Sequence, residues 1–140
     1  MENTVLEKFH QGRQSLGTFS AIGSPLAVES LRYTGLDYVI VDTEHSPAGI
    51  ESAAAQIAAA QGAGLTALAR ANEISRTAVL RLLDVGAQGV VVPCVETVEE
   101  VRELVRYAKF APLGNRGFCP PRDGGWGHAA HAVSISGYME

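Results

Sequence analysis

The chain has 140 residues, of which 46% are hydrophobic and 19% are charged, a composition typical of one soluble globular domain, or of part of one, that can bury a core. Its formal net charge is −4 and its 11 lysines and arginines are scattered, which excludes the basic patch of a nucleic-acid-binding protein. No apolar run approaches the roughly 18 to 20 residues that cross a bilayer, and residues 1–14 are too polar for a signal peptide, so we expect a cytoplasmic protein.

The first third of the chain predicts two strands and two helices. Apolar residues at helical spacing indicate a short helix over residues 3–10, and alternation over residues 16–22 indicates a strand. Pro25 favours a helix start, and residues 26–33 continue with helical spacing. The apolar run over residues 38–41 then predicts the second strand.

The middle of the chain repeats this strand–helix pattern. Residues 49–63 are rich in alanine, which favours a helix that packs closely on a sheet. Residues 65–69 predict the third strand, which delivers Arg70 at its end. Ser75 is a typical helix cap and Gly86 a typical helix stop, so a third helix lies between them.

A fourth strand–helix unit follows. Residues 89–93 form a continuous apolar run, typical of a strand that is buried on both faces. Thr97 and Glu100 have the spacing of a capping box. The helix that they open carries one apolar stripe, made of Val98, Val101, Leu104, Val105 and Ala108. Four such units in a row predict a parallel sheet with right-handed crossovers.

Two cysteines and a glycine-rich tail lie outside this pattern. Cys94 and Cys119 are too far apart for a CxxC motif, so we expect two free thiols, with Cys94 partly buried after the fourth strand. From residue 111 onward glycine and proline are frequent, which predicts a long loop that is functional or disordered. His128 and His131 have the spacing of a metal pair, but two histidines without a carboxylate are a weak metal signal.

Ionisable residues follow two neighbouring strands. Asp42, Glu44 and His45 come directly after the second strand, and Arg70 ends the third. The carboxyl ends of parallel strands meet at one edge of a sheet, so we expect these side chains to converge with Pro93 and with the loop after Pro112. His45 can transfer protons near neutral pH, and Arg70 can bind a carboxylate or an enolate oxygen. The alternatives are a turn in which Asp42 is only a cap and an Arg70 that only forms a salt bridge.

Four motifs in the chain form an ordered set: Asp42-Thr43-Glu44-His45-Ser46-Pro47, a strand ending in Arg70, Leu82-Leu83-Asp84-Val85-Gly86-Ala87-Gln88 leading into Val90-Val91-Val92-Pro93, and Pro112-Leu113-Gly114-Asn115-Arg116-Gly117. In order and spacing this set resembles the class II pyruvate aldolases. These are the metal-dependent hydroxy-oxo-acid aldolases typified by 4-hydroxy-2-oxoheptanedioate aldolase and 2-keto-3-deoxy sugar acid aldolase. The resemblance runs from about Leu16 to Gly117.

The resemblance implies the α/β class and a TIM (β/α)8 barrel, of which this chain covers about the first four β/α units plus a long loop. Residues 1–140 would then be a single partial domain, the amino-terminal half of the barrel. The implied reaction is reversible retro-aldol cleavage of a 4-hydroxy-2-oxo acid to pyruvate and an aldehyde, through a metal-stabilised pyruvate enolate. The implied cofactor is Mg²⁺, Mn²⁺ or Co²⁺, and the implied assembly is a homo-oligomer.

The same resemblance implies catalytic roles for four residues. Arg70 matches the arginine that binds the substrate carbonyl and the developing enolate, and His45 matches the histidine that transfers protons. Asp84 matches the acidic residue that works with this histidine, and Asp42 lies in the same motif as His45. Asp84 falls at the end of the third predicted helix, which in a barrel lies near the face opposite the strand ends, so a contact with His45 within one subunit is not expected and one across a subunit interface would resolve the mismatch. The alternative is a helix-end residue tied to nearby backbone.

The resemblance implies substrate-binding residues in this chain, but it implies no metal ligands here. Arg116 and Gly117 lie in a flexible, cationic segment that suits an anionic group, or that is only a surface loop. The family's metal ligands, a glutamate and an aspartate, match no position before Glu140, so we expect no metal site within this chain and an inactive chain on its own. Glu44 receives no role. Residues 118–127 depart from the family's small-residue run, which leaves the aldehyde specificity open.

Two other functions are compatible with the pattern. One is a non-catalytic half-barrel module that is stable only by self-association or by binding a partner, since an uncovered parallel edge favours pairing. The other is an open flavodoxin-like sheet that binds phosphate through residues 114–117. This second alternative lacks a glycine-rich turn after the first strand and ranks last.

Overall fold

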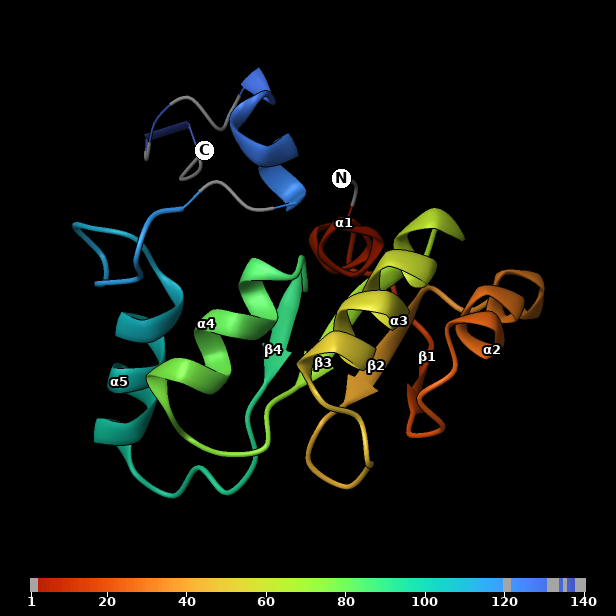
Figure 1. Ribbon diagram of the computed structural model, residues 1–140, viewed down its shortest axis with the longest axis horizontal. Coiled ribbons are helices and arrows are strands. Elements are labelled where there is room, and N and C mark those ends of the chain that lie inside the picture. The colour runs from red at the N-terminus through yellow and green to blue at the C-terminus, as the bar shows by residue number, and fades with distance from the viewer. Residues whose placement is uncertain (1–2, 120–121, 131–133, 135, 138–140) are drawn as a thin grey trace.

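The computed structural model describes residues 3–119, 122–130, 134 and 136–137. It shows a parallel four-stranded sheet in the order β1-β2-β3-β4, with helices between the strands (Figure 1). The elements are α1 (Thr4–His10), β1 (Gly17–Ser20), α2 (Pro25–Ser30), the 3-10 helix η1 (Leu31–Thr34), β2 (Tyr38–Asp42), α3 (Ile50–Gly62), β3 (Thr66–Arg70), α4 (Arg76–Asp84), β4 (Gly89–Val91), α5 (Val98–Ala108) and the 3-10 segment η2 (Arg122–Gly127).

Local signals place most of these elements as predicted. The Ser75 hydroxyl accepts the backbone N–H of Ala78 and caps α4, and Thr97 and Glu100 close a complete capping box at α5. The predicted helix over residues 26–33 is divided, because α2 ends at Ser30 and continues as η1. The parallel order and the four strand–helix units are confirmed.

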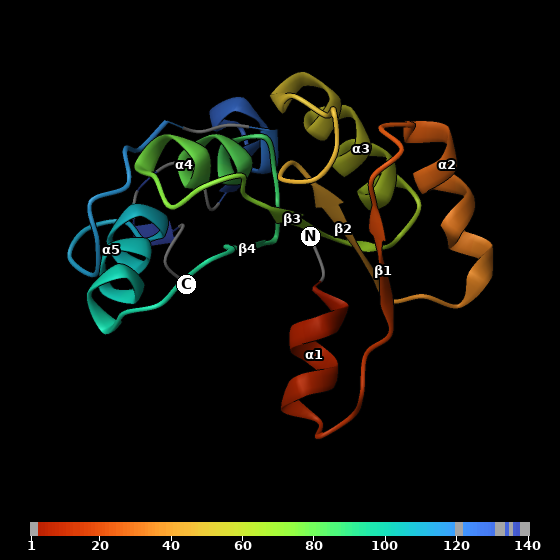
Figure 2. The same ribbon diagram turned by 90° about the horizontal axis from the view of Figure 1, so that it is seen from below.

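The core lies between the sheet and the helices that follow each strand. Figure 2 shows α2, α3, α4 and α5 in succession along one side of the sheet, with α1 on the other side. Alternate residues of β2 and β3 face the helices and are buried, as are Ile57 and several alanines of α3. The small alanines allow α3 to lie close to the strands. The remaining strand residues therefore face what is the interior of a barrel in this fold class.

The amino-terminal helix closes the amino-end side of the sheet. The backbone N–H of Thr4 donates to the Thr66 hydroxyl at the start of β3, and the Asn3 side chain donates to the carbonyl of Gln88, directly before β4. Lys8 forms an ion pair with Asp37, which precedes β2. α1 therefore lies at the amino ends of the strands, and a site can form at their carboxyl ends.

Two predictions about burial are wrong. The fourth strand was expected to be buried on both faces, but every residue of β4 is half-buried and the strand ends at Val91. The reason is that β4 pairs with β3, and no other described strand pairs with its second edge. Cys94, which follows β4, was expected to be partly buried and is exposed. Among the described residues, no helix has the length and apolar character needed to cross a membrane.

Candidate active site

The site is built on a pair of register partners. Asp42 ends β2 and Arg70 ends β3, and the two residues stand opposite each other in the parallel ladder, so their side chains leave the same face. Arg70 Nε donates to Asp42 Oδ1 at 2.9 Å, and Nη2 donates to Oδ2 at 2.7 Å. Only 4% of the Asp42 side chain and 21% of the Arg70 side chain is exposed. This is a bidentate, largely desolvated ion pair.

The surroundings of this pair keep both partners charged. The hydrogen bonds from Arg70, and after them those from the backbone N–H groups of Glu44 and His45, together lower the pKa of Asp42 to about 2, against the effect of burial. Asp42, and then Glu44, raise the pKa of Arg70. The guanidinium is therefore a permanent cation at the end of the sheet.

The loop after β2 is folded around the Asp42 carboxylate. Besides accepting from two N–H groups of the loop, Asp42 offers its backbone carbonyl to the Ser46 hydroxyl. The Thr43 hydroxyl donates to the Arg70 carbonyl at 2.6 Å, which ties the loop to β3. Asp42 is thus both a turn-forming residue and the ion-pair partner of Arg70. The interpretation of Asp42 as a turn-capping residue and its interpretation as a residue of the candidate site are therefore compatible.

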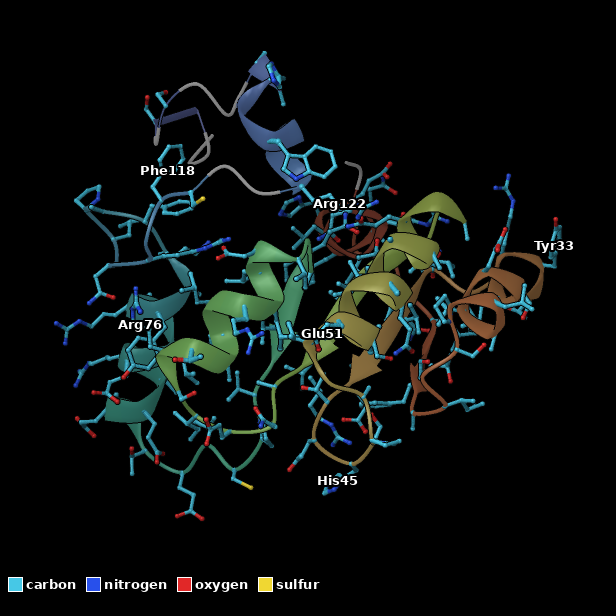
Figure 3. The ribbon with its side chains drawn as sticks, viewed as in Figure 1. Tyr33, His45, Glu51, Arg76, Phe118 and Arg122 are labelled. Atoms are coloured by element: carbon cyan, nitrogen blue, oxygen red, sulfur yellow. The ribbon has the colours of Figure 1, made fainter. Side chains whose placement is uncertain are left out.

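Glu44 joins the arginine to the histidine. Its Oε2 lies 3.2 Å from Arg70 Nη1, and its Oε1 lies 3.5 Å from His45 Nε2. The Glu44 side chain is 16% exposed, and Oε2 is buried without a hydrogen bond from any described residue. His45 is 70% exposed at the tip of the loop (Figure 3). Sequence reasoning gave Glu44 no role, although its position two residues after Asp42 was the available signal.

One face of the arginine is covered by an aromatic ring. The Arg70 guanidinium carbon lies 4.9 Å from the centre of the Phe19 ring, which comes from β1. Asp42 accepts hydrogen bonds from Nε and Nη2, whereas Nη1 lies 3.2 Å from Glu44 Oε2, an oxygen that accepts no hydrogen bond from the described residues. The arrangement can present a fixed cationic donor to an oxygen that gains negative charge.

Asp84 and Arg116 form a separate cluster. Asp84 is the last residue of α4, and its Oδ1 accepts from Arg116 Nη2 at 2.8 Å. The Arg116 guanidinium carbon lies 4.8 Å from the centre of the Phe110 ring. Among the described residues, no ion pair or hydrogen bond joins this cluster to His45 or Arg70. Within one chain the structure therefore does not bring Asp84 to His45.

The carboxylates and imidazoles that the structure describes do not assemble a metal site. Within the part of the chain that the structure describes, no three histidine, cysteine, aspartate or glutamate side chains are grouped to hold a metal ion. Both Asp42 oxygens are already occupied by Arg70. His131, half of the weak histidine pair, lies outside the described residues.

The fold and site define a parallel β/α protein with a charged centre at its strand ends. The chain belongs to the HpcH/HpaI aldolase/citrate lyase family, whose model matches residues 15–136. This confirms the resemblance to the pyruvate aldolases and the assignment to the TIM-barrel fold class.

Individual relatives agree with this family. The chain is 31% identical over 137 residues to a hydroxypyruvate/pyruvate aldolase of Roseovarius nubinhibens, covering 98% of this chain and 52% of that one. It is 31% identical over 117 residues to a 4-hydroxy-2-oxo-heptane-1,7-dioate aldolase of Escherichia coli, and the match covers 84% of this chain and 45% of that aldolase. The solved HpcH/HpaI aldolase of Desulfitobacterium hafniense matches with a TM-score of 0.75 and 38% identity, and the match covers 81% of this chain and 44% of the solved chain. The chain thus spans about half the length of these relatives.

Proposed function

We propose that this chain forms the amino-terminal half of a metal-dependent class II pyruvate aldolase, which reversibly cleaves a 4-hydroxy-2-oxo acid to pyruvate and an aldehyde. The observation that carries the proposal is Arg70, a desolvated cation that Asp42 and Glu44 hold at the end of the sheet. Two relatives, named as pyruvate and 4-hydroxy-2-oxo acid aldolases, support the substrate class.

Retro-aldol chemistry needs a cation where Arg70 lies. When the bond between C3 and C4 of the substrate breaks, its electron pair moves into a pyruvate enolate and the ketone oxygen becomes negative. Arg70 Nη1 is the donor that can stabilise this oxygen, because Asp42 already holds the other side of the guanidinium. Asp42 therefore acts as the residue that orients Arg70.

His45 is the proton-transfer group of the proposal. It takes the proton of the C4 hydroxyl as the aldehyde carbonyl forms, and the enolate carbon C3 is protonated afterwards to give pyruvate. Its exposed position leaves it accessible to substrate, and Glu44 lies close enough to orient its Nε2. Asp84 takes the role of acidic partner only from a neighbouring copy, so a homo-oligomer is part of the proposal. Arg116 and Gly117 would bind substrate only in such an assembly.

The metal of the proposal is Mg²⁺, Mn²⁺ or Co²⁺. When bound, such an ion would act as a Lewis acid toward the 2-oxo acid. The described residues of this chain do not form a site that fits it. We therefore assign the metal ligands to the other half of the barrel.

The test uses a complete barrel, made by joining this chain to the carboxy-terminal half of the Desulfitobacterium hafniense aldolase. We expect release of pyruvate from 4-hydroxy-2-oxo acids, loss of this release after treatment with a chelator, and recovery on adding Mg²⁺ or Mn²⁺. Turnover that persists in a metal-free preparation would contradict the metal-dependent mechanism. A folded, metal-loaded barrel that cleaves no member of a 4-hydroxy-2-oxo acid panel would contradict the proposed function.

Glu44 supplies a further prediction. In the same complete barrel, Glu44→Gln should lower kcat by about tenfold and leave KM nearly unchanged, because the amide keeps the shape but removes the charge that orients His45 and Arg70. Steady-state pyruvate release measures both constants. Glu51→Gln, at an exposed position on α3 (Figure 3), is the matched control and should stay within twofold. An equal effect of the two substitutions would show that Glu44 has no positioning role.

A further inference from the structure

We propose that Gln56 is a positioning residue for the charged centre and that it acts through Ser20. The hydrogen bond between these two side chains fixes the carboxyl end of β1, and with it the ring of Phe19, which covers one face of the Arg70 guanidinium. The consequence for catalysis rests on the proposed function, but the position of Phe19 can be measured without any reaction.

Gln56 is an exception within the core. It lies on α3 and is 0% exposed, as are its apolar neighbours Ala53, Ile57 and Ala60 on the same helix. A buried amide costs free energy unless its polar atoms find partners. An apolar residue at this position would avoid that cost, so the partners of the amide indicate what it does.

The amide is satisfied by a short network. The Ser20 hydroxyl donates to Gln56 Oε1 at 2.7 Å. Gln56 Nε2 donates to the backbone carbonyl of Ser52 at 3.4 Å and to its hydroxyl at 3.3 Å, and the Ser52 hydroxyl donates to the Gly23 carbonyl at 3.5 Å. None of the buried side-chain atoms that lack a partner in the described part of the chain belongs to this network. A fully satisfied buried network makes the segments that it joins rigid.

The network ties the first half of α3 to the segment that leaves β1. Ser20 is the last residue of β1 and is 9% exposed. Gly23 lies in the turn that follows, with a φ of 75° that favours glycine. Both ends of this short segment are therefore held by side chains of α3. The loop that carries His45 leads directly into α3, so the same contacts set the loops after β1 and β2 relative to each other.

Phe19 depends on this anchor because its own side chain is only partly covered. Side chains alternate along a strand, so Ser20 faces the helices while Phe19 faces the opposite side, toward Arg70. Phe19 is 51% exposed, and packing around the ring alone does not hold it. Its place is set by the backbone of β1, which Ser20 ties to α3. A shift of this backbone would move the ring away from the guanidinium carbon, which now lies 4.9 Å from the ring centre.

The position of Phe19 matters for Arg70 in two ways. An aromatic ring attracts a cation that lies over its face, and more strongly where water is excluded. The ring also limits the directions in which the guanidinium can turn, and a donor that is preorganised toward an oxyanion needs a fixed direction. In the proposed reaction, a displaced Phe19 should therefore lower kcat more than it raises KM.

The test follows the Arg70 Nε–H signal in nuclear magnetic resonance spectra of the 140-residue chain. The ring current of an aromatic side chain shifts a proton above its face upfield, so Phe19→Leu gives the downfield position expected without the ring. We expect Gln56→Met to move the signal at least about half of the way to that position. Gln61→Met is the matched control, because Gln61 lies at the far end of α3 and donates to the Gly86 carbonyl. It should leave the signal in place.

A double substitution separates positioning from stability. Gln56→Met alone leaves the buried Ser20 hydroxyl without its partner, whereas Gln56→Met combined with Ser20→Ala removes both polar groups. The free energy of unfolding should therefore recover part of its loss in the double variant. The Arg70 signal should stay displaced, because the tie between β1 and α3 is still missing. Ser20→Ala alone breaks the same hydrogen bond and replaces Gln56→Met in the test if that variant does not fold.

An Arg70 signal that stays in place in the folded Gln56 and Ser20 variants would overturn the proposal, and so would an equal displacement in Gln61→Met. In the complete barrel, Gln56→Met should lower kcat about threefold to tenfold with KM nearly unchanged. A barrel that is inactive without any substitution would contradict the proposed function, and the spectra of the 140-residue chain would still decide whether Gln56 positions Phe19.

Discussion

Arg70→Ala should lower the kcat of the complete barrel by about a hundredfold or more, the loss typical of removing one preorganised donor to an oxyanion. The substitution deletes the only cation that the described residues place at the ends of β2 and β3, and it leaves Asp42 and Glu44 without the charge between them. Because the enolate oxygen gains its charge only as the bond between C3 and C4 breaks, kcat should fall more than KM rises. Steady-state release of pyruvate measures both.

Two companion variants make this result specific. Arg76→Ala removes an exposed arginine from the start of α4 (Figure 3) and should leave kcat within about twofold. Arg70→Lys keeps the charge but cannot engage both Asp42 oxygens and still offer a second nitrogen, so most of the activity should be lost. Unchanged turnover in Arg70→Ala would remove Arg70 from the mechanism and with it the observation on which the proposed function rests.

The helices and strands could be predicted because their signals are local. Thr97 and Glu100 are three residues apart, and the capping box they form depends on no other part of the chain. The apolar run that became β2 ends at Asp42, where a turn begins. Burial could not be read in the same way. The run at residues 89–93 has the composition of a central strand, but whether it is central depends on a neighbour beyond β4, which local periodicity does not reveal.

The location of the candidate site could be predicted from the sequence, but the contacts between its side chains could not. Parallel order is enough to bring Asp42 and Arg70 to one edge, and the structure confirms that they meet. That they are register partners depends on how β2 and β3 align, which the sequence does not specify. The same limit explains Glu44, whose contact with Arg70 follows from the path of the loop. Asp84 was predictable as a helix-end residue, and its partner Arg116 comes from 32 positions further along the chain.

The charged centre lies on the face of the sheet that is turned away from α2, α3, α4 and α5. The residues that face the barrel interior from β1, β2 and β3, such as Phe19 and Arg70, are sheltered on one side by the sheet and open on the other. A second half-barrel would close that side and lower the local dielectric, which strengthens the interaction of Arg70 with a developing oxyanion. In the proposed enzyme, completion of the barrel therefore matters for the chemistry of Arg70.

Asp42→Asn should lower the free energy of unfolding of the chain by about 3 kcal/mol at pH 6, the loss expected when one partner of a buried ion pair is removed. The amide cannot accept two charge-assisted hydrogen bonds from Arg70, and it weakens the turn formed by the N–H groups of Glu44 and His45. Urea unfolding at a series of pH values measures the effect. Glu99→Gln, at an exposed position on α5, should change the free energy by less than about 0.5 kcal/mol.

The pH dependence of the free energy of unfolding distinguishes loss of this ion pair from a purely steric effect of Asp42→Asn. The pKa of Asp42 is lowered from 3.8 to about 2 in the folded chain, so the folded state binds fewer protons than the unfolded state in this range. The stability that the carboxylate contributes is therefore fully present above about pH 4 and is lost as the pH falls toward 2. We expect the difference between the unmodified chain and Asp42→Asn to shrink over this interval. A difference that stays constant from pH 6 to pH 2 would show that the charge of Asp42, and its pairing with Arg70, does not stabilise the fold.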